Sequence, residues 1–153
     1  MTAGEDPYSG CGGATGRREF LKECAGLAVV ILVGRPSRNT GAVEYPVPAG
    51  DIALMDRENQ LILVRRQNEC YAFALSCPHQ NTALKWLPAD SRFQCPKHKS
   101  KYGPDGVFLS GRATRNMDRL PIRRAGDRLL IDADKVYESD KDAAGWAAAV
   151  VKL

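Results

Sequence analysis

Short runs of aliphatic or alternating residues, separated by turn residues, fill the chain from residue 43 onward. Alternate side chains of a β-strand face opposite sides, so this pattern predicts strands rather than helices. The predicted strands are residues 43–47, 51–55, 60–66, 70–75, 107–109, 120–124 and 128–132. Polar residues and glycine at 67–69 and 125–127 predict hairpin turns. Short strands with frequent turns indicate an all-β domain, an antiparallel sandwich or barrel.

The first 36 residues have a different pattern. An apolar run at 24–33 follows the basic sequence GRREFLK at 16–22. A basic segment before a short apolar one predicts a targeting segment rather than part of the fold. GRREFLK resembles a twin-arginine export signal, a route that carries folded proteins; the alternative is an ordinary amphipathic helix. We expect residues 1–36 to be a twin-arginine signal or an N-terminal membrane anchor helix, followed by a linker at 37–41.

Whether the predicted signal is cleaved or stays as a membrane anchor depends on the length of its apolar run and on the residues that follow it. The apolar run is shorter than the roughly 20 residues of a spanning helix, but it extends back to Phe20 if Lys22 and Glu23 lie at the membrane interface. No small-residue cleavage site follows Val33. We therefore favour an uncleaved anchor, with the folded domain on the periplasmic face of a bacterial inner membrane.

The C-terminal residues 136–153 form an extension with helical character. Residues 139–151 are rich in alanine and carry acidic residues near their start, which predicts a short helix capped by Ser139 or Asp140. Trp146 and Val150 lie four residues apart and would share a helix face. That face either docks a partner subunit or packs against the chain's own domain.

Composition is typical of one small domain. The chain has 153 residues, a net charge of +4 and a pI of about 8.9, which is too mildly basic to indicate nucleic-acid binding. It has five cysteines, and Cys70 lies in an apolar run where we expect a buried small hydrophobe. Cys11 and Cys24 have no obvious partner.

Two short sequences carry the candidate chemistry: Cys77-Pro78-His79 and Cys95-Pro96-Lys97-His98. They contain both histidines of the chain, and each pairs a thiolate with an imidazole. Two cysteines and two histidines suit either tetrahedral zinc or a Rieske [2Fe-2S] cluster. Zinc sites usually pair like ligands at short spacing. Because each loop here holds one of each, the pattern favours the iron–sulfur cluster.

The spacing of these two motifs resembles the signature of the Rieske family over residues 42–132. The resemblance implies that Cys77 and Cys95 bind one iron of a single [2Fe-2S] cluster, and that His79 and His98 bind the other. It also implies a Rieske-type fold at 42–135, with a small cluster-binding subdomain.

Two further residues extend the resemblance. Ser100 and Tyr102 fall where high-potential members of the family carry hydroxyl donors to the cluster sulfurs. A donor to a sulfur favours the reduced cluster and so raises the potential. The alternatives are an exposed loop serine and ordinary packing of the tyrosine.

No other motif in the sequence supplies substrate chemistry. Both histidines are assigned to iron, and no glycine-rich phosphate loop joins a strand to a helix. We therefore expect an electron-transfer subunit without catalytic residues of its own. The favoured function is the iron–sulfur subunit of a cytochrome bc-type quinol:cytochrome c oxidoreductase, with a cytochrome b and a c-type cytochrome as partners. The alternatives are the small subunit of a molybdenum oxidoreductase similar to arsenite oxidase, with a molybdopterin subunit as partner, and a soluble Rieske ferredoxin of an oxygenase.

Three positions bear on the choice of partner. Quinol-oxidising Rieske proteins usually carry a disulfide between the loops and an apolar residue after the first histidine. The matching positions here are Thr82 and Lys97, and Gln80. Residues 76–102 hold five basic side chains and one acidic one, which predicts either a surface that docks an acidic partner such as a cytochrome c or a merely solvated surface.

Overall fold

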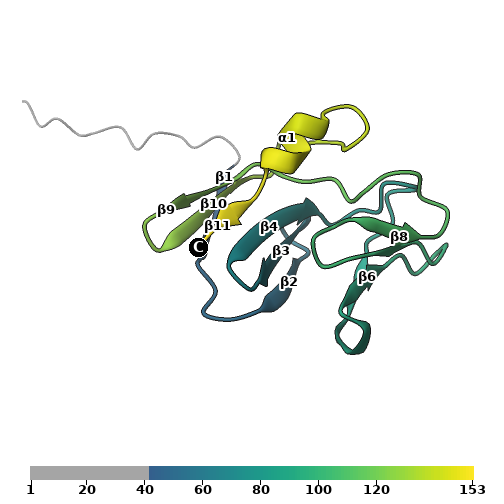
Figure 1. Ribbon diagram of the computed structural model, residues 1–153, viewed down its shortest axis with the longest axis horizontal. Helices are drawn as coiled ribbons and strands as arrows, with labels where there is room; N and C mark the ends of the chain where they lie inside the picture. The colour runs from purple at the N-terminus through teal and green to yellow at the C-terminus, as the bar shows by residue number, and fades with distance from the viewer. Residues whose placement is uncertain (1–41) are drawn as a thin grey trace, which may run out of the picture. The chain divides into compact units, whose positions relative to one another are not determined.

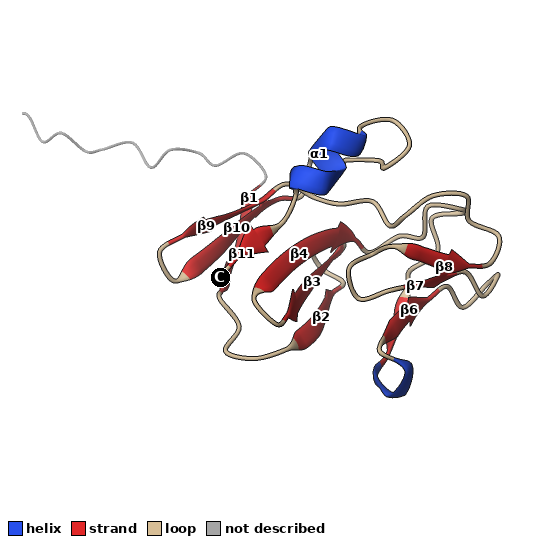
Figure 2. Ribbon diagram, viewed as in Figure 1, coloured by secondary structure: helices blue, strands red, loops and turns tan. Residues whose placement is uncertain are grey.

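The computed structural model describes residues 42–153. The predicted export signal at 1–36 and the linker at 37–41 lie outside the described residues. Three antiparallel sheets and one short C-terminal helix make up the described part (Figure 2), which confirms the all-β fold class. Within residues 42–153, no helix is long and apolar enough to cross a membrane.

The first sheet pairs the first strand of the described chain with a hairpin from its C-terminal half. Its order is β1 (Ala42–Pro46), β10 (Arg128–Asp132) and β9 (Ile122–Ala125). β9 and β10 form the hairpin predicted around 125–127, where Gly126 has a φ of +63°. A positive φ is readily adopted by glycine, which explains why this turn is visible in the sequence.

The second sheet lies between two hydrophobic cores. Its order is β11 (Val151–Lys152), β4 (Glu69–Ala74), β3 (Leu61–Arg66) and β2 (Ile52–Asp56). Leu61 and Leu63 of β3 pack in one core with residues of β10, while Ile62 and Val64 pack in the other core. Because β3 is covered on both faces, it is a continuous apolar run rather than an alternating one. Cys70 of β4 is fully buried, as predicted.

The third sheet forms the smaller lobe. Its order is β5 (Lys85–Leu87), β6 (Arg92–Gln94), β7 (Lys101–Tyr102) and β8 (Phe108–Ser110), and a 3₁₀ turn at Pro88–Asp90 connects β5 to β6 (Figure 1). Only the last of these strands was predicted. Strands of two or three residues are too short to show a period of two.

The C-terminal helix α1 (Ala143–Ala148) packs on the chain's own domain. Trp146 Nε1 donates a hydrogen bond to the Met117 carbonyl at 2.7 Å. Asp142 caps the helix by accepting from Gly145 N at 2.8 Å, so the prediction of Ser139 or Asp140 as the cap was wrong. Ser139, four residues before the helix begins, instead accepts from Asn116 N at 3.2 Å.

The helix ends before Val150, and the chain continues into β11, which pairs with β4. Arg119 ties this segment to both lobes. Its guanidinium lies 3.7 Å from the Trp146 ring centroid and 4.7 Å from that of Tyr71, and it donates to the carbonyls of Trp146 and Asp105 at 2.9 Å each. Such stacking of a buried cation on aromatic rings fixes the helix against the core.

Candidate metal centre

The first cysteine loop connects β4 to β5 and is closed by its own backbone. Cys77 N donates to the Thr82 carbonyl at 2.9 Å, and Asn81 N donates to the Cys77 carbonyl at 2.9 Å. Pro78 follows the cysteine and fixes its own φ. Asn81 has a φ of 49°, a left-handed conformation that asparagine tolerates better than most residues. The loop is therefore a tight, non-helical turn.

The second cysteine loop connects β6 to β7 and repeats the same bonds. Cys95 N donates to the Ser100 carbonyl at 2.9 Å, and Lys99 N donates to the Cys95 carbonyl at 3.0 Å. Lys99 has a φ of 59°, at the position equivalent to Asn81. The two loops thus share one backbone pattern, and they differ in placing the histidine two or three residues after the cysteine.

The loops bring the four predicted ligands together. Cys77 and Cys95 are buried, with exposed fractions of 0% and 2%, in the same hydrophobic core. Burial is the main cause that raises the pKa of the Cys77 thiol. The rings of His79 and His98 meet edge to face, with centroids 4.9 Å apart.

Each of the two imidazoles has a ring nitrogen that is free to bind a metal. The Nδ1 atoms of His79 and His98 are both buried and have no hydrogen-bond partner. A buried polar atom without a partner costs free energy unless a ligand satisfies it. Burial, and then the nearby charges of His79, Arg112 and Lys97, lowers the pKa of His98. The neutral imidazole, which is the form that binds metal, is thereby favoured.

The donor set fits a two-iron cluster. Within residues 42–153, no group of three or more His, Cys, Asp or Glu side chains is arranged around a single ion. A Rieske cluster does not require such a group, because each iron has two protein ligands: two cysteines bind one iron and two histidines bind the other. Four ligands in two pairs, with both sulfurs buried, agree with that requirement.

Tyr102 contacts one of the cysteine sulfurs. Its Oη lies 3.3 Å from Cys77 Sγ, and the side chain is fully buried. Burial is the main cause that raises the pKa of Tyr102, and the Cys77 charge adds to it. The phenol therefore keeps its proton and is able to donate it to the sulfur. Tyr102 also packs in the core, as the packing alternative requires.

Ser100 is fully buried, which excludes an exposed loop serine. Its Oγ accepts hydrogen bonds from Arg112 N and Ala113 N, at 3.1 Å each. In the described part of the chain, no hydrogen bond joins Ser100 Oγ to a cysteine sulfur. Sequence reasoning did not assign a role to the backbone of residues 111–113; Gly111 immediately after a strand was the available signal.

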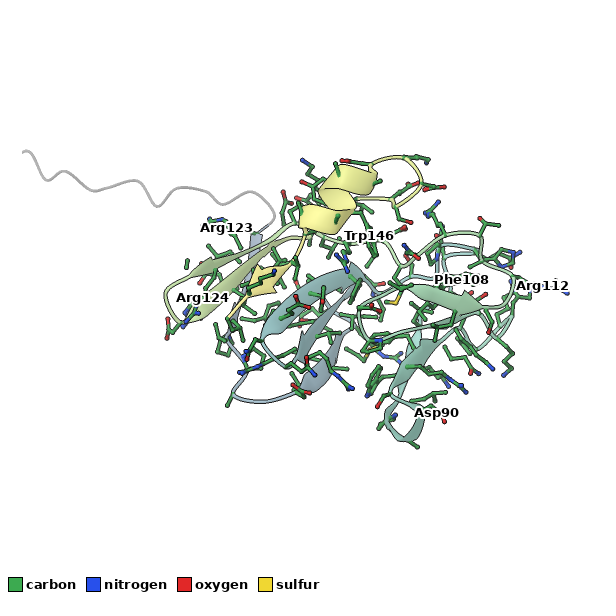
Figure 3. All side chains as sticks on the ribbon, in the orientation of Figure 1. Asp90, Phe108, Arg112, Arg123, Arg124 and Trp146 are labelled. Carbon is green, nitrogen blue, oxygen red and sulfur yellow. The ribbon has the colours of Figure 1, made fainter. Side chains whose placement is uncertain are left out.

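The basic side chains near the histidines differ in their exposure. Lys97 and Lys99 are exposed, but Lys101 is half-buried in β7, and Arg92 pairs with Asp90 at 2.9 Å. Arg112 is exposed and projects from the end of the smaller lobe (Figure 3). We call Lys97, Lys99 and Arg112 the basic tip.

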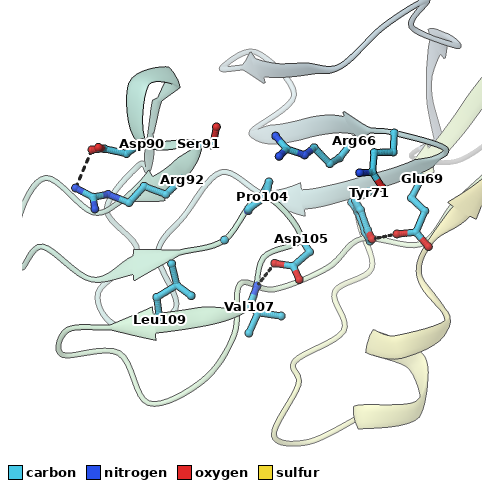
Figure 4. Close-up of a pocket in the computed structure, with 12 residues that line it drawn as sticks. Arg66, Glu69, Tyr71, Asp90, Ser91, Arg92, Pro104, Asp105, Val107 and Leu109 are labelled. Carbon is cyan, nitrogen blue, oxygen red and sulfur yellow. Dashed lines mark hydrogen bonds and ion pairs between the residues drawn. The ribbon is translucent and has the colours of Figure 1, made fainter.

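A cavity of about 580 Å³ lies away from the candidate ligands, between the β3–β4 turn, the 3₁₀ turn and residues 103–109 (Figure 4). Several of its charged side chains already have partners. Arg92 binds Asp90, Tyr71 Oη donates to Glu69, and Asp105 accepts from Val107 N at 3.1 Å. The cavity contains none of the four predicted ligands.

The sequence of this chain is similar to those of several known proteins. A family model for the Rieske [2Fe-2S] domain matches residues 44–122, more than half of the chain. The cytochrome b6-f complex iron-sulfur subunit of Chlorobaculum thiosulfatiphilum is 28% identical over 86 residues, which cover 56% of this chain and 48% of that protein. The cytochrome b6-f complex iron-sulfur subunit 3 of Nostoc sp. is 45% identical over 56 residues, which cover 37% of this chain and 32% of that protein. The chain thus spans about half, or less, of the length of these relatives.

Among solved structures, the plasma membrane Rieske protein PetC3 from Synechocystis PCC 6803 aligns with a TM-score of 0.49 and 22% sequence identity. The alignment covers 58% of this chain and 97% of that one.

Proposed function

Because this chain belongs to the Rieske [2Fe-2S] domain family, we propose that Cys77 and Cys95 bind one iron of its cluster and that His79 and His98 bind the other. The cofactor is a Rieske-type [2Fe-2S] cluster, and the domain transfers electrons through it. When bound, the cluster takes up and releases one electron at a time. One observation carries the ligand assignment: two loops with the same backbone bonds bring together two buried sulfurs and two imidazoles whose Nδ1 atoms lack partners.

The chain's residues prepare this site in three ways. The buried sulfurs and the surrounding core exclude water from the cysteine side. The imidazoles stand on the more exposed side, where His79 and His98 are both half-buried. An electron therefore has its shortest path to a partner through the histidine edge, beside the basic tip.

We further propose that the chain is the iron–sulfur subunit of a cytochrome bc-type quinol:cytochrome c oxidoreductase. Its relatives are named as subunits of cytochrome b6-f complexes. The twin-arginine signal predicted at 1–36 would deliver the folded, cluster-loaded domain to the periplasmic face of the membrane. Hydroxyls at Ser100 and Tyr102 support a higher potential, as quinol oxidation requires.

A second candidate is the small subunit of a periplasmic molybdenum oxidoreductase. Thr82 and Lys97 leave the two loops without a disulfide between them, and the exposed Gln80 makes the residue after the first histidine polar. Both features depart from quinol-oxidising Rieske proteins.

Purification of the native protein from detergent-solubilised membranes distinguishes the two candidates. We expect a cytochrome b among the co-purifying subunits. A molybdopterin subunit in its place would select the second candidate, and recovery of the chain without either would contradict both.

The basic tip is proposed to dock an acidic c-type cytochrome. Lys97 and Arg112 lie close enough to His98 to lower its pKa, so their charges surround the edge through which the electron leaves. Electron transfer to a soluble acidic cytochrome should slow steeply with salt, since the Debye length falls from about 10 Å at 0.1 M to about 3 Å at 1 M.

Charge reversal provides a matched test of this docking. Arg112→Glu should slow electron transfer at low salt and flatten its salt dependence. Arg123 is also exposed and lies on β9, at the opposite end of the view in Figure 3, so Arg123→Glu should leave the rate unchanged. Equal effects of the two substitutions, or a rate of the unaltered protein that does not respond to salt, would contradict a basic docking site.

A further inference from the structure

Gly111 allows a very close approach of two backbone segments beside the second loop. It has a φ of +120°. A Cβ at this position would lie 2.4 Å from Ser100 Cα and 2.9 Å from both Ser100 N and Ser100 Oγ. The nearest of these atoms belongs to the backbone, which cannot rotate away as a flexible side chain does. Both the conformation and the space at residue 111 therefore require glycine.

The close approach determines how the Ser100 hydroxyl is used. Arg112 N and Ala113 N, the two amides that follow Gly111, both donate to Ser100 Oγ at 3.1 Å. A serine hydroxyl has two acceptor lone pairs and one donor hydrogen. Because the amides occupy both lone pairs, the Ser100 O–H remains available only as a donor, directed away from residues 112 and 113.

The remaining direction leads toward the cysteines. Ser100 immediately precedes β7, whose second residue is Tyr102, and both side chains are fully buried. Tyr102 Oη lies 3.3 Å from Cys77 Sγ. The Ser100 carbonyl accepts from Cys95 N, which ties the same residue to the other cysteine.

We propose that Gly111 is a positioning residue for the reduction potential of the cluster: by admitting the amides of Arg112 and Ala113, it holds the Ser100 hydroxyl as a donor toward the cluster sulfurs. This inference rests on the proposed function, in which the two loops hold the cluster. A donor to sulfur stabilises the more negative, reduced state and raises the midpoint potential. Gly111 acts only through Ser100 and touches no ligand itself.

The test is a double-mutant comparison of midpoint potentials in the cluster-loaded chain. Ser100→Ala and Gly111→Ala should each shift the midpoint to lower potential. The double variant Gly111→Ala/Ser100→Ala should match Ser100→Ala alone, because Gly111 has nothing left to position. Gly126→Ala is the matched control: Gly126 also has a positive φ, but no atom lies within 4 Å of its added Cβ. Its potential should be unchanged.

Each outcome separates this inference from the proposed function. A shift in Ser100→Ala without one in Gly111→Ala would overturn the role of Gly111 and leave that of Ser100. Additive shifts in the double variant would show that Gly111 acts by another route, which also overturns it. An unchanged potential in Ser100→Ala would show that Ser100 does not tune the cluster. It would then overturn the inference about Gly111 as well.

A second variant keeps the test decisive if Gly111→Ala fails to hold iron. Ala113→Pro removes one of the two amide donors and leaves Gly111 in place, at a residue whose φ is not positive. It should lower the potential in the presence of Ser100 and have no effect in the Ser100→Ala background. An unchanged potential with Ser100 present would overturn the inference.

Discussion

The two cysteine loops share the same backbone hydrogen bonds, but the hydroxyls of their last residues, Thr82 and Ser100, have different partners. In each loop the cysteine amide donates to the carbonyl five residues on, and the cysteine carbonyl accepts from the amide four residues on. In the first loop, the Thr82 hydroxyl donates to the Gln80 carbonyl at 3.3 Å, within the loop itself. In the second, the Ser100 hydroxyl is buried and receives two amides from residues outside the loop.

This difference suggests that binding the cluster and setting its reduction potential depend on different parts of the site. A shared backbone pattern lets each loop present one cysteine and one histidine from opposite sides. The second loop also leads into β7, which carries Tyr102 back to the sulfur of the first loop. On the proposed assignment, both loops supply ligands, and the second loop alone controls the potential.

Loss of a cysteine ligand should have the largest effect and should be equal for the two loops. We expect Cys77→Ser or Cys95→Ser to abolish the Rieske EPR signal of the reduced protein and the bound iron, and His98→Cys to abolish the signal. Cys70 is as deeply buried but lies in β4 away from the loops, so Cys70→Ala is the matched control and should keep both.

An unchanged spectrum in any of the three ligand variants would refute the ligand assignment. A preparation that binds zinc in place of iron and labile sulfide would refute it as well, since zinc is the other metal suited to this donor set.

Removal of the Tyr102 hydroxyl should have an intermediate effect. Tyr102→Phe deletes the donor to Cys77 Sγ while keeping the buried ring, so the protein should fold and hold its cluster. If the hydrogen bond favours the reduced state by about 1 kcal/mol, the midpoint falls on the order of 40 mV. Tyr71→Phe is the control, because Tyr71 packs in the same core but donates to Glu69. Equal potentials for Tyr102→Phe and the unaltered protein would limit Tyr102 to packing.

Substituting glycine at the two left-handed loop positions, Asn81 and Lys99, should have the smallest effect. The resulting change in the free energy of unfolding should differ between the loops. Lys99 has a φ of 59°, which strains a long side chain, whereas Asn81 at 49° is tolerated. We expect Lys99→Gly to raise the free energy of unfolding by about 1 kcal/mol and Asn81→Gly to leave that free energy nearly unchanged. Denaturant unfolding of the two variants measures this. A destabilised Lys99→Gly would show that the lysine side chain, rather than its backbone, contributes to stability.

Sequence reasoning predicted the features that depend on local residues. The seven predicted strands correspond to β1–β4 and β8–β10, and Cys70 is buried as expected. The strands of the smaller lobe at 85–94 and 101–102 were missed because they are too short to carry a pattern, and β11 because it follows an alanine-rich helix. Pairing across the sheet, rather than local preference, makes these residues strands.

The candidate site was predicted as a set of residues but not as a mechanism. Ser100 was expected to act as a donor, yet the two amides that direct its hydroxyl come from residues 12 and 13 positions later in the chain. The predicted docking surface included Arg92 and Lys101; the structure pairs the first with Asp90 and half-buries the second. Such partners depend on the folded chain and leave no trace in spacing or composition.

One redox titration tests most directly that only the second loop tunes the cluster. The midpoint potentials of the unaltered protein, Thr82→Ala and Ser100→Ala are measured side by side by EPR. These substitutions remove a hydroxyl from equivalent positions of the two loops. We predict the same Rieske spectrum in all three proteins, an unchanged potential for Thr82→Ala and a lower one for Ser100→Ala. Equal shifts in the two variants, or no shift in either, would contradict the account.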